Sequence, residues 1–457
     1  MRAVPQAEGD TRCVLYLAPM PWHGRSYEGM KGVALNESRR ERRPNMKGWR
    51  VAPYLLWSLV FGLILGLTPV FAGEPPKGTI KLYTSWPMQG AMIPEGTAMK
   101  RAVDLAIEHA GGMVAGYKIE VVNLDDASPV TGSWDGTVEA ENAQKAIADP
   151  DAMVYIATYN SGAAKVSMPI TNKAGMAQVT VANTYPGLTK PGNAPGEPGI
   201  YRPTGKVNYF RAHPADDIQG AAAAKWAQCL GFKRVFILDD RQLYGKGIAD
   251  VFEKTAKELG LQIVGHEGVE SVDIDFRALL TKVKAANPDL VYGGFVIDSG
   301  GPQVIQQMKA LGLFDAKVKF MGPDGLYSPA LVEQATPAAV NNNVYVTFAG
   351  LPPDQLPTEV GKRFYTDFKA KYKEEPIGWA MYAYQATIVT LDAINRAGVK
   401  DRAKIIEALQ NTKNFEGITG RFSFDENGDT DRTDMGGFQV KDNKFQFVGL
   451  ISKDKCP

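Results

Sequence analysis

Cysteine and histidine are scarce in this chain of 457 residues, which contains three of the former and four of the latter. No HExxH pair and no Cys/His cluster with metal-ligand spacing occurs, so the sequence offers no metal site and we expect no cofactor. The GxGxxG, GxxxxGKS/T and GxSxG motifs are also missing where a strand pattern meets a helix pattern. We therefore expect no catalytic residue and no enzymatic activity, with a secreted α/β enzyme as the disfavoured alternative.

An excess of basic charge is also missing. The sequence has 51 Lys and Arg against 50 Asp and Glu, but ten of the basic and five of the acidic residues precede residue 73. The remainder has 41 basic and 45 acidic residues, a formal net charge of −4. Proteins that bind nucleic acid carry a basic patch or stripe, so we expect no nucleic-acid partner.

Long apolar runs are limited to one place near the N-terminus. Residues 1–45 are polar and without a sustained period, and we interpret them as a disordered extension or a mis-assigned translation start. Residues 46–72 have a basic start, an apolar core and a small-residue ending at Ala72, the pattern of a secretory signal peptide. Cleavage near Ala72 predicts a periplasmic or otherwise extracytoplasmic protein. An uncleaved membrane anchor is the alternative, and two prolines and the Ala72 ending favour cleavage.

The cysteines divide between this leader and the rest of the chain. Cys13 lies in the leader, Cys229 in an expected helix and Cys456 beside the C-terminus. The sequence leaves open whether Cys229 and Cys456 pair. A buried, inert Cys229 and a loose Cys456 are the favoured interpretation.

Residues 425–431 form an acidic stretch that superficially resembles a calcium-binding loop. It lacks the flanking helices and the closing glutamate of such a loop. We interpret it as a solvated hairpin turn.

Strand and helix patterns alternate after residue 78, which predicts parallel sheets covered by helices on both faces. In the first series, strands are expected at 79–84, 117–124, 153–157 and 176–181, and helices at 95–110, 134–148 and 163–173. A second α/β series runs from 208 to 348, helices follow from 359, and a hairpin-like stretch closes the chain at 420–450. Between the two series, residues 185–206 contain five prolines and five glycines and predict a long loop, either a flap or a mobile excursion.

The unit at 153–186 supplies a candidate binding site. Tyr159, Asn160 and Ser161 lie between a strand and a helix, where side-chain groups and free backbone N–H groups at a helix N-terminus favour an anion. Ala182 and Thr184 end the next strand, at the sheet edge where open α/β sheets bind ligands. An ordinary helix cap is the alternative interpretation of the loop.

Several strings at characteristic spacing resemble the periplasmic branched-chain amino acid binding proteins, the type I substrate-binding proteins of ABC importers. They are Leu124–Ala127, Asp240–Gly247, Tyr292–Phe295 and Phe320–Gly325. The resemblance covers essentially all of residues 79–450. It implies an α/β fold of two lobes, each a mostly parallel sheet flanked by helices, joined by three hinge crossings near residues 211–214, 347–350 and 420.

The resemblance also implies the lobe boundaries. Residues 79–211 together with 348–420 would form lobe 1. Residues 212–347 together with 421–457 would form lobe 2.

The same resemblance implies a ligand site between the lobes. Its members would be Tyr159, Asn160, Ser161, Ala182, Thr184, Tyr244, Phe295, Asp324 and Tyr382. Ser161 and Thr184 would bind the ligand carboxylate, Ala182 and Asp324 the ammonium, and the aromatic residues would form walls. A carboxylate and a cluster of donors suit the two ends of a zwitterion. This chain departs from the family where Ser128 and Asn160 occupy the places of a disulfide, and where Asp324 replaces a glutamate.

The function that follows is capture of a small amino acid or derivative by closure of the two lobes. We expect a monomer that delivers its ligand to the permease subunits of an ABC importer at the membrane. The alternative is a sensing module of the same fold that reports to a chemoreceptor or regulator. The identity of the ligand does not follow from the sequence.

Overall fold

The computed structural model describes residues 76–270 and 274–457, all of which belong to a unit that runs from Gly73 to Pro457. The predictions for residues 1–45, the signal peptide at 46–72 and Cys13 lie outside the described residues. Within the described ranges, no helix combines the length and the apolar character needed to cross a membrane.

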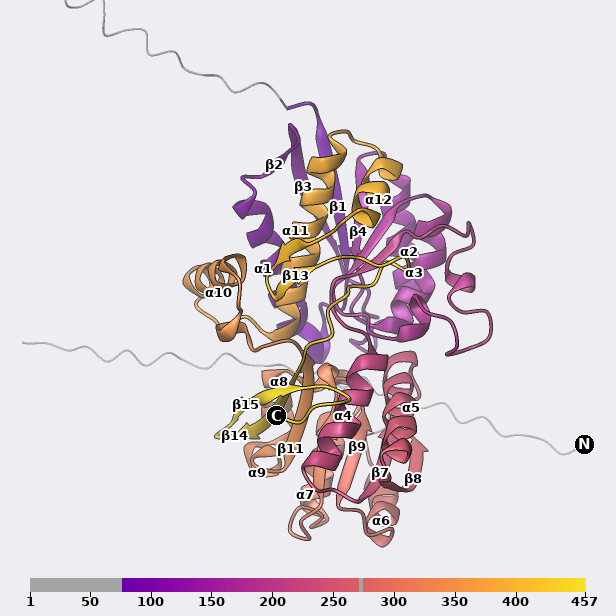
Figure 1. Cartoon of the computed structure of the whole chain (residues 1–457), viewed down its shortest axis with the longest axis vertical. Coiled ribbons are helices and arrows are strands. Elements are labelled where there is room, and N and C mark those ends of the chain that lie inside the picture. Colours follow the sequence, from indigo (N-terminus) through magenta and orange to yellow (C-terminus); the bar gives the residue numbers. More distant parts are fainter. Residues whose placement is uncertain (1–75, 271–273) are drawn as a thin grey trace, which may run out of the picture. The chain divides into compact units, whose positions relative to one another are not determined.

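The first sheet has six strands in the order β2-β3-β1-β4-β5-β6, and we call the half of the molecule around it lobe 1 (Figure 1). Its strands are β1 (Thr79–Ser85), β2 (Met113–Val114), β3 (Tyr117–Leu124), β4 (Ala152–Ala157), β5 (Ala177–Thr180) and β6 (Tyr209–Arg211). All neighbouring strands are parallel except the β2–β3 hairpin. The helices of lobe 1 are α1 (Ile93–His109), α2 (Gly136–Ala148), α3 (Ser161–Lys173), α10 (Glu359–Tyr372), α11 (Gly378–Ala397) and α12 (Arg402–Gln410). Figure 1 shows α11 and α12, from the C-terminal part of the chain, beside the N-terminal strands of this sheet.

The second sheet has seven strands in the order β15-β14-β11-β10-β9-β7-β8, and the half around it is lobe 2. Its strands are β7 (Arg234–Asp239), β8 (Gln262–Gly268), β9 (Leu290–Gly294), β10 (Lys319–Gly322), β11 (Val344–Ala349), β14 (Met435–Lys441) and β15 (Lys444–Ile451). Its helices are α4 (Asp216–Cys229), α5 (Leu243–Glu258), α6 (Arg277–Ala285), α7 (Gly301–Ala310), α8 (Pro329–Ala335) and α9 (Pro337–Val340). A small hairpin of β12 (Phe415–Gly417) and β13 (Gly420–Phe422) precedes β14.

Burial follows the type of strand. All six residues of β4, with the sequence AMVYIA, are buried, as in a parallel strand covered on both faces. β15 alternates between exposed and half-buried residues, as at the antiparallel edge of a sheet. Two mostly parallel sheets with flanking helices confirm the predicted fold class.

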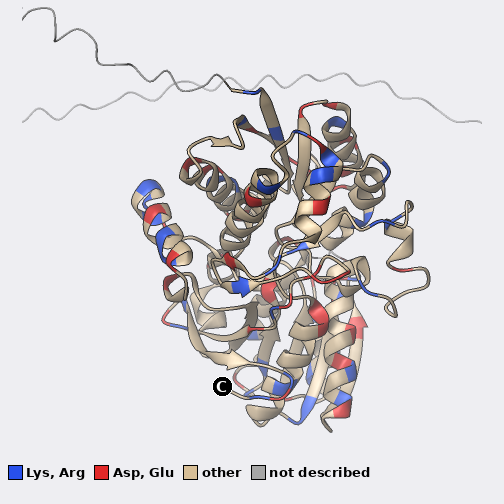
Figure 2. Ribbon diagram, turned by 45° about the horizontal axis from the view of Figure 1, so that its top comes forward, with Lys and Arg blue, Asp and Glu red and all other residues tan. Residues whose placement is uncertain are grey.

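Charged residues of both signs are interspersed on the outer helices (Figure 2). In α10, for example, Glu359 pairs with Lys362 at 2.8 Å and Arg363 with Asp367 at 3.4 Å. Such exposed pairs contribute little to stability.

The chain passes between the lobes after β6, after β11 and after β13. The turn at 425–431 follows the third of these passages and is solvated only in part: Glu426 and Asp431 are exposed, as predicted. Asp429, however, is 4% exposed, and its carboxylate accepts a 3.0 Å hydrogen bond from Nε of the fully buried Arg211. The prediction was wrong for Asp429 because this part of the turn packs against the end of β6, where the Arg211 N–H donates to the Gly428 carbonyl at 2.8 Å.

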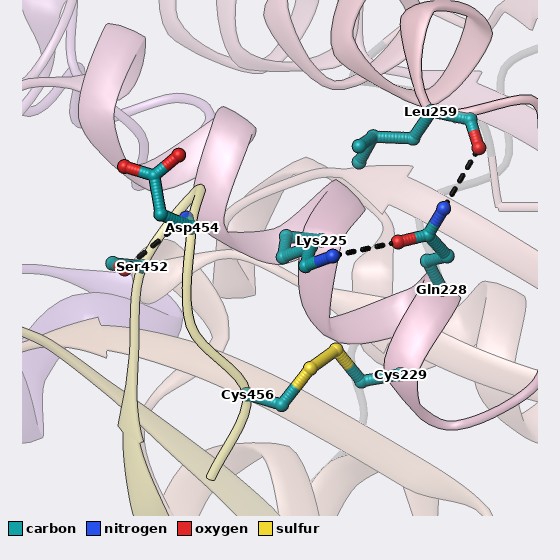
Figure 3. The surroundings of a disulfide bond; sticks show 7 residues. All are labelled: Lys225, Gln228, Cys229, Leu259, Ser452, Asp454 and Cys456. Carbon is teal, nitrogen blue, oxygen red and sulfur yellow. Dashed lines mark hydrogen bonds between the residues drawn. A yellow bond between two sulfur atoms is a disulfide. The ribbon is translucent and has the colours of Figure 1, made fainter.

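Cys229 and Cys456 form a disulfide, so the favoured interpretation of two unpaired cysteines was wrong (Figure 3). Cys229 ends α4, and the tail that follows β15 passes beside it, which brings the two Cα atoms to 6.1 Å. That distance suits a disulfide. Cys229 and Cys456 are 227 positions apart in the sequence, and no local sequence pattern predicts a contact over that separation.

The Pro/Gly-rich loop at 185–206 is folded against lobe 1. Its centre is a buried carboxylate, that of Glu197, which accepts hydrogen bonds from the hydroxyls of Tyr185 at 3.1 Å and Tyr201 at 2.7 Å. Leu188 and Tyr201 belong to an apolar cluster with Met168 of α3. These contacts hold the loop in place.

Candidate functional site

The carboxyl ends of parallel strands from both sheets meet at one small cavity. Residues following β4 and β5 and one residue of α11 line it from lobe 1; residues following β7, β9 and β10 line it from lobe 2. They are Tyr159, Asn160, Ser161, Ala182 and Trp379 on the first side, and Tyr244, Val296, Asp324 and Gly325 on the second. This edge is where open α/β sheets bind ligands.

The lobe 1 side presents the N-terminus of α3. Asn160 precedes the helix with an extended backbone, and Ser161 is its first residue. The first backbone N–H groups of a helix have no partner inside it, and together with the macrodipole they favour an anion. The Ser161 hydroxyl oxygen accepts a 3.3 Å hydrogen bond from the Tyr185 N–H and retains its own proton for a ligand.

Asn183 fixes the loop that carries these residues. Its side-chain amide donates to the Tyr159 carbonyl at 2.9 Å, and its amide oxygen accepts from the Tyr209 hydroxyl at 3.1 Å. Asn183 is fully buried and lies between Ala182 and Thr184. The end of β5 thus holds the loop after β4 in a fixed position.

The lobe 2 side presents a carboxylate. Asp324 begins the short 3₁₀ helix η5 (Asp324–Leu326) after β10 and is 3% exposed. The Tyr244 hydroxyl, from the start of α5, donates to Oδ1 of Asp324 at 3.0 Å and accepts from the Gly325 N–H at 3.0 Å. Burial raises the pKa of Asp324 to about 7. The site therefore contains an acid that a cationic ligand group would ionise.

A second buried carboxyl group, that of Asp216, lies near Asp324. Asp216, the first residue of α4, is fully buried, and neither of its carboxylate oxygens has a hydrogen-bond partner in the described part of the chain. Burial and then the negative charge of Asp324 raise the pKa of Asp216 well above its usual value. The Thr184 hydroxyl lies close enough to Asp216 to oppose this rise.

Six of the nine predicted site residues line the cavity, and three do not. Thr184 is 1% exposed and lies two residues beyond Ala182. Phe295 is fully buried in the lobe 2 core, next to Val296. Tyr382 lies beside Trp379, at 5.6 Å between ring centroids, and donates to the Ala349 carbonyl at 3.3 Å.

Three lining residues escaped the sequence analysis: Val296, Gly325 and Trp379. Val296 and Gly325 each adjoin a predicted residue, and Trp379 lies one helical turn before the predicted Tyr382 on the same helix, so i,i+3 spacing could have suggested it. Two lining residues hold unpaired polar atoms. Oδ1 of Asn160 and Nε1 of Trp379 are buried without a partner among the described residues.

One group of side chains in lobe 2 has the composition of a metal site: Asp250, Glu253 and His266. Both ring nitrogens of His266 already bind carboxylates, those of Glu253 at 2.5 Å and Asp239 at 2.9 Å. Burial would lower the pKa of His266, but these hydrogen bonds raise it. Lys246 pairs with Asp250 at 2.5 Å. The group is thus balanced by its own cations and needs no ion.

Similar proteins show the family of the chain. A family model described as periplasmic binding protein matches residues 79–444. This chain belongs to that family. The family is one of extracytoplasmic solute-binding proteins and not of enzymes.

Relatives from three bacteria have informative names. The chain is 31% identical to a leucine-, isoleucine-, valine-, threonine- and alanine-binding protein of Pseudomonas aeruginosa, over 78% of this chain and 88% of the relative. A leucine-binding protein of Thermotoga maritima superposes with a TM-score of 0.73 at 29% identity, over 82% of this chain and 99% of that one. A branched-chain amino acid transporter substrate-binding protein of Streptococcus pneumoniae, in complex with isoleucine, gives a TM-score of 0.71 at 25% identity over the same shares.

Proposed function

We propose that this protein captures an α-amino acid or a close derivative between its lobes and delivers it to the permease subunits of an ABC importer. The observation that carries this proposal is the polarity of the cavity, with a helix N-terminus on one side and a buried carboxylate on the other. A zwitterion has the complementary arrangement of charges. The ligands in the names of the Pseudomonas aeruginosa and Streptococcus pneumoniae relatives are amino acids, which agrees with it. Three more distant structural neighbours hold benzoate or a hydroxybenzoate.

The lining residues divide into three roles. The hydroxyl of Ser161 and the first N–H groups of α3 bind the ligand carboxylate. Thr184 lies behind this lining, with its hydroxyl near Asp216, and supports the site without touching the ligand. The carboxylate of Asp324 and the Ala182 carbonyl bind the ammonium. The aromatic rings of Tyr159, Tyr244 and Trp379 enclose the part of the ligand between its two ends. Closure of the lobes around these contacts would provide the differential binding that a hinge motion needs.

The cellular setting is part of the proposal. A signal peptide at 46–72 would direct export, cleavage near Ala72 would release the protein, and the released protein would act as a monomer. Mass spectrometry of exported protein should find an N-terminus near Gly73. Recovery of an intact 46–72 segment would show instead that the segment anchors the protein.

Calorimetric titration with single amino acids and their deaminated analogues tests the site. A hydrogen bond to a charged group contributes about 1.5–3 kcal/mol, so Ser161→Ala should bind roughly tenfold more weakly or worse. Asp324→Asn should weaken binding of amino acids and should lose discrimination against the deaminated analogues.

The matched control is Asp315→Asn, which removes an exposed carboxylate of lobe 2 and should leave affinity unchanged. If wild type and Asp324→Asn bind an amino acid and its deaminated analogue equally well, the ligand has no ammonium at this position. An aromatic or aliphatic carboxylate would then replace the amino acid in the proposal.

A further inference from the structure

Two polar atoms of residues that line the cavity lack a hydrogen-bond partner in the described part of the chain. They are Oδ1 of Asn160, an acceptor, and Nε1 of Trp379, whose N–H is a donor. Asn160 is 8% exposed and Trp379 is 1% exposed. Buried polar groups are nearly always hydrogen-bonded, because a group removed from water without a partner is costly. A molecule bound in the cavity would supply the partner of both atoms.

Asn160 occupies a position where its side chain would ordinarily cap a helix. It is the N-cap residue of α3, and asparagine at such a position usually accepts a hydrogen bond from the second or third N–H of the helix. Here the side chain makes no capping hydrogen bond to α3. The backbone is nevertheless fixed, since the Asn160 carbonyl accepts from the Thr158 hydroxyl at 2.9 Å and from the Ala163 N–H at 3.0 Å. The side-chain oxygen therefore remains available to a ligand.

The indole of Trp379 is held by aromatic rings on several sides. Trp379 is the second residue of α11, and it makes edge-to-face contacts with three other rings. The ring centroids lie 5.1 Å from Phe348, 5.3 Å from His213 and 6.4 Å from Tyr159. An indole packed in this way is oriented before a ligand arrives. Because Tyr159 precedes Asn160 in the chain, the donor and the acceptor belong to the same side of the cavity, that of lobe 1.

The head group of an amino acid does not use this donor and this acceptor. In the proposed function, Ser161 and the α3 N-terminus bind the carboxylate, and Asp324 with the Ala182 carbonyl binds the ammonium. The two remaining atoms require a ligand group that accepts one hydrogen bond and donates another. A hydroxyl and a carboxamide both do so, whereas a side-chain ammonium has no acceptor and an ionised carboxylate has no donor. An alkyl side chain would leave both atoms buried and unpaired.

We propose that Asn160 and Trp379 form a subsite for an uncharged hydrogen-bonding group, so that the ligand is an amino acid with a hydroxyl or carboxamide side chain and not a branched aliphatic one. This rests on the proposed function, because the head group must be held as described there. The two residues determine specificity. The indole N–H of Trp379 donates to the oxygen of the ligand side chain, and Oδ1 of Asn160 accepts its hydroxyl or amide hydrogen.

Pairs of ligands with the same head group and nearly the same shape isolate the side-chain group. L-threonine has a hydroxyl where L-valine has a methyl group, and L-asparagine has a carboxamide where L-leucine has a branched alkyl group. A site built to hydrogen-bond a ligand group rejects the analogue that lacks it, because its own polar atoms are then left unpaired. Calorimetric titration of the wild-type protein should show about tenfold tighter binding, or more, of the polar member in one pair. That pair identifies the group as a hydroxyl or a carboxamide.

Two variants remove the subsite one atom at a time. Trp379→Phe removes the indole N–H and keeps an aromatic ring, and Asn160→Leu removes the amide and keeps a side chain of similar size. Each should lower the ratio of polar to apolar affinities by about threefold or more. The matched control is Trp226→Phe. Trp226 is 1% exposed and its indole N–H also lacks a partner among the described residues, but it does not line the cavity, so the ratio should not change.

A spectroscopic measurement reports the contact itself. In isotope-labelled protein, the indole N–H signal that is missing from the spectrum of Trp379→Phe belongs to Trp379, and that of Trp226 is assigned in the same way. A hydrogen bond to the ligand should move the Trp379 signal downfield with the favoured polar ligand and less with its apolar partner. The Trp226 signal should stay in place with both. The affinity ratio of the wild-type protein needs no variant, so it tests the inference even if a variant does not fold.

The outcomes separate this inference from the proposed function. If the polar and apolar members of both pairs bind equally well, the inference is overturned while the head-group site stands, and water satisfies the two atoms. If both variants fold and keep the wild-type ratio, the inference is also overturned, because other residues then select the ligand. If no α-amino acid binds to the wild-type protein, the proposed function itself fails, and the inference fails with it.

Discussion

Replacing Asp429 should destabilise the protein strongly, because Asp429 neutralises a guanidinium that is fully removed from water. Arg211 is 0% exposed, and its Nη2 lies 2.9 Å from the Asp429 carboxylate. The same guanidinium donates to the Thr189 hydroxyl at 2.5 Å and to the Tyr185 carbonyl at 3.0 Å. These partners are polar but uncharged, so none of them can replace the lost negative charge.

Removing one partner of a buried ion pair costs about 3–5 kcal/mol. Asp429→Asn keeps one oxygen as an acceptor, and we expect it to lower the free energy of unfolding by about 3 kcal/mol. Asp429→Ala removes both oxygens, one of which accepts the 2.8 Å hydrogen bond from the Thr189 hydroxyl. We expect it to lower the free energy of unfolding by about 5 kcal/mol. Urea unfolding followed by circular dichroism would measure both losses as a lower transition midpoint at an unchanged slope.

Glu426→Gln is the matched control, because Glu426 is an exposed residue of the same turn and should change stability by less than about 0.5 kcal/mol. Pairing Arg211→Met with Asp429→Leu should recover much of the loss, since an apolar pair leaves no buried charge. If Asp429→Asn unfolds within about 1 kcal/mol of wild type, the guanidinium is stabilised by its other partners or by water, and the reasoning is refuted.

Two further predictions concern lobe 2. Reduction of the disulfide, or the double substitution Cys229→Ser and Cys456→Ser, should lower the free energy of unfolding by about 2–5 kcal/mol, because the bond closes a long loop. Equal melting temperatures with and without reductant would contradict this. His266→Gln should destabilise the protein more at pH 6 than at pH 9. Because the pKa of His266 is raised in the folded state, its charged form contributes its full stabilisation below about pH 6.5, and this stabilisation is lost as the pH rises through the folded-state pKa. If His266→Gln lowers the free energy of unfolding equally at both pH values, His266 does not have this role.

Local sequence patterns predicted the structural features that depend on neighbouring residues. The apolar strand at 153–157, the loop after it and the helix at 163–173 follow from local periodicity, and the structure has them in that order, with the helix beginning two residues earlier, at Ser161. The placement of Asp324 just after a parallel strand follows from the same rules. Local patterns were sufficient because each of these features depends on residues that are close together in the sequence.

Features that depend on long-range contacts could not be read in this way. Asp429 belongs to a polar turn that any local rule would place in water, and only its contact with β6 buries it. Glu95 resembles an ordinary first-turn acid of a helix, yet it is 1% exposed in the folded chain. Trp379 resembles one more apolar residue of a buried helix, because helical spacing does not say which neighbour of Tyr382 reaches the cavity.

The disulfide also affects how one edge of the second sheet resists aggregation and proteolysis. β15 is the edge strand of the second sheet, and the outward side chains of Val448 and Leu450 are 46% and 37% exposed. A frayed edge strand would uncover unpaired backbone groups of β14, which other chains or proteases can engage. Because Cys456 is attached to α4 through Cys229, the chain end beyond β15 cannot peel away while the bond is intact. The crosslink therefore protects this edge of the second sheet against aggregation and digestion. Because both cysteines belong to lobe 2, it does so without restraining the motion of one lobe against the other.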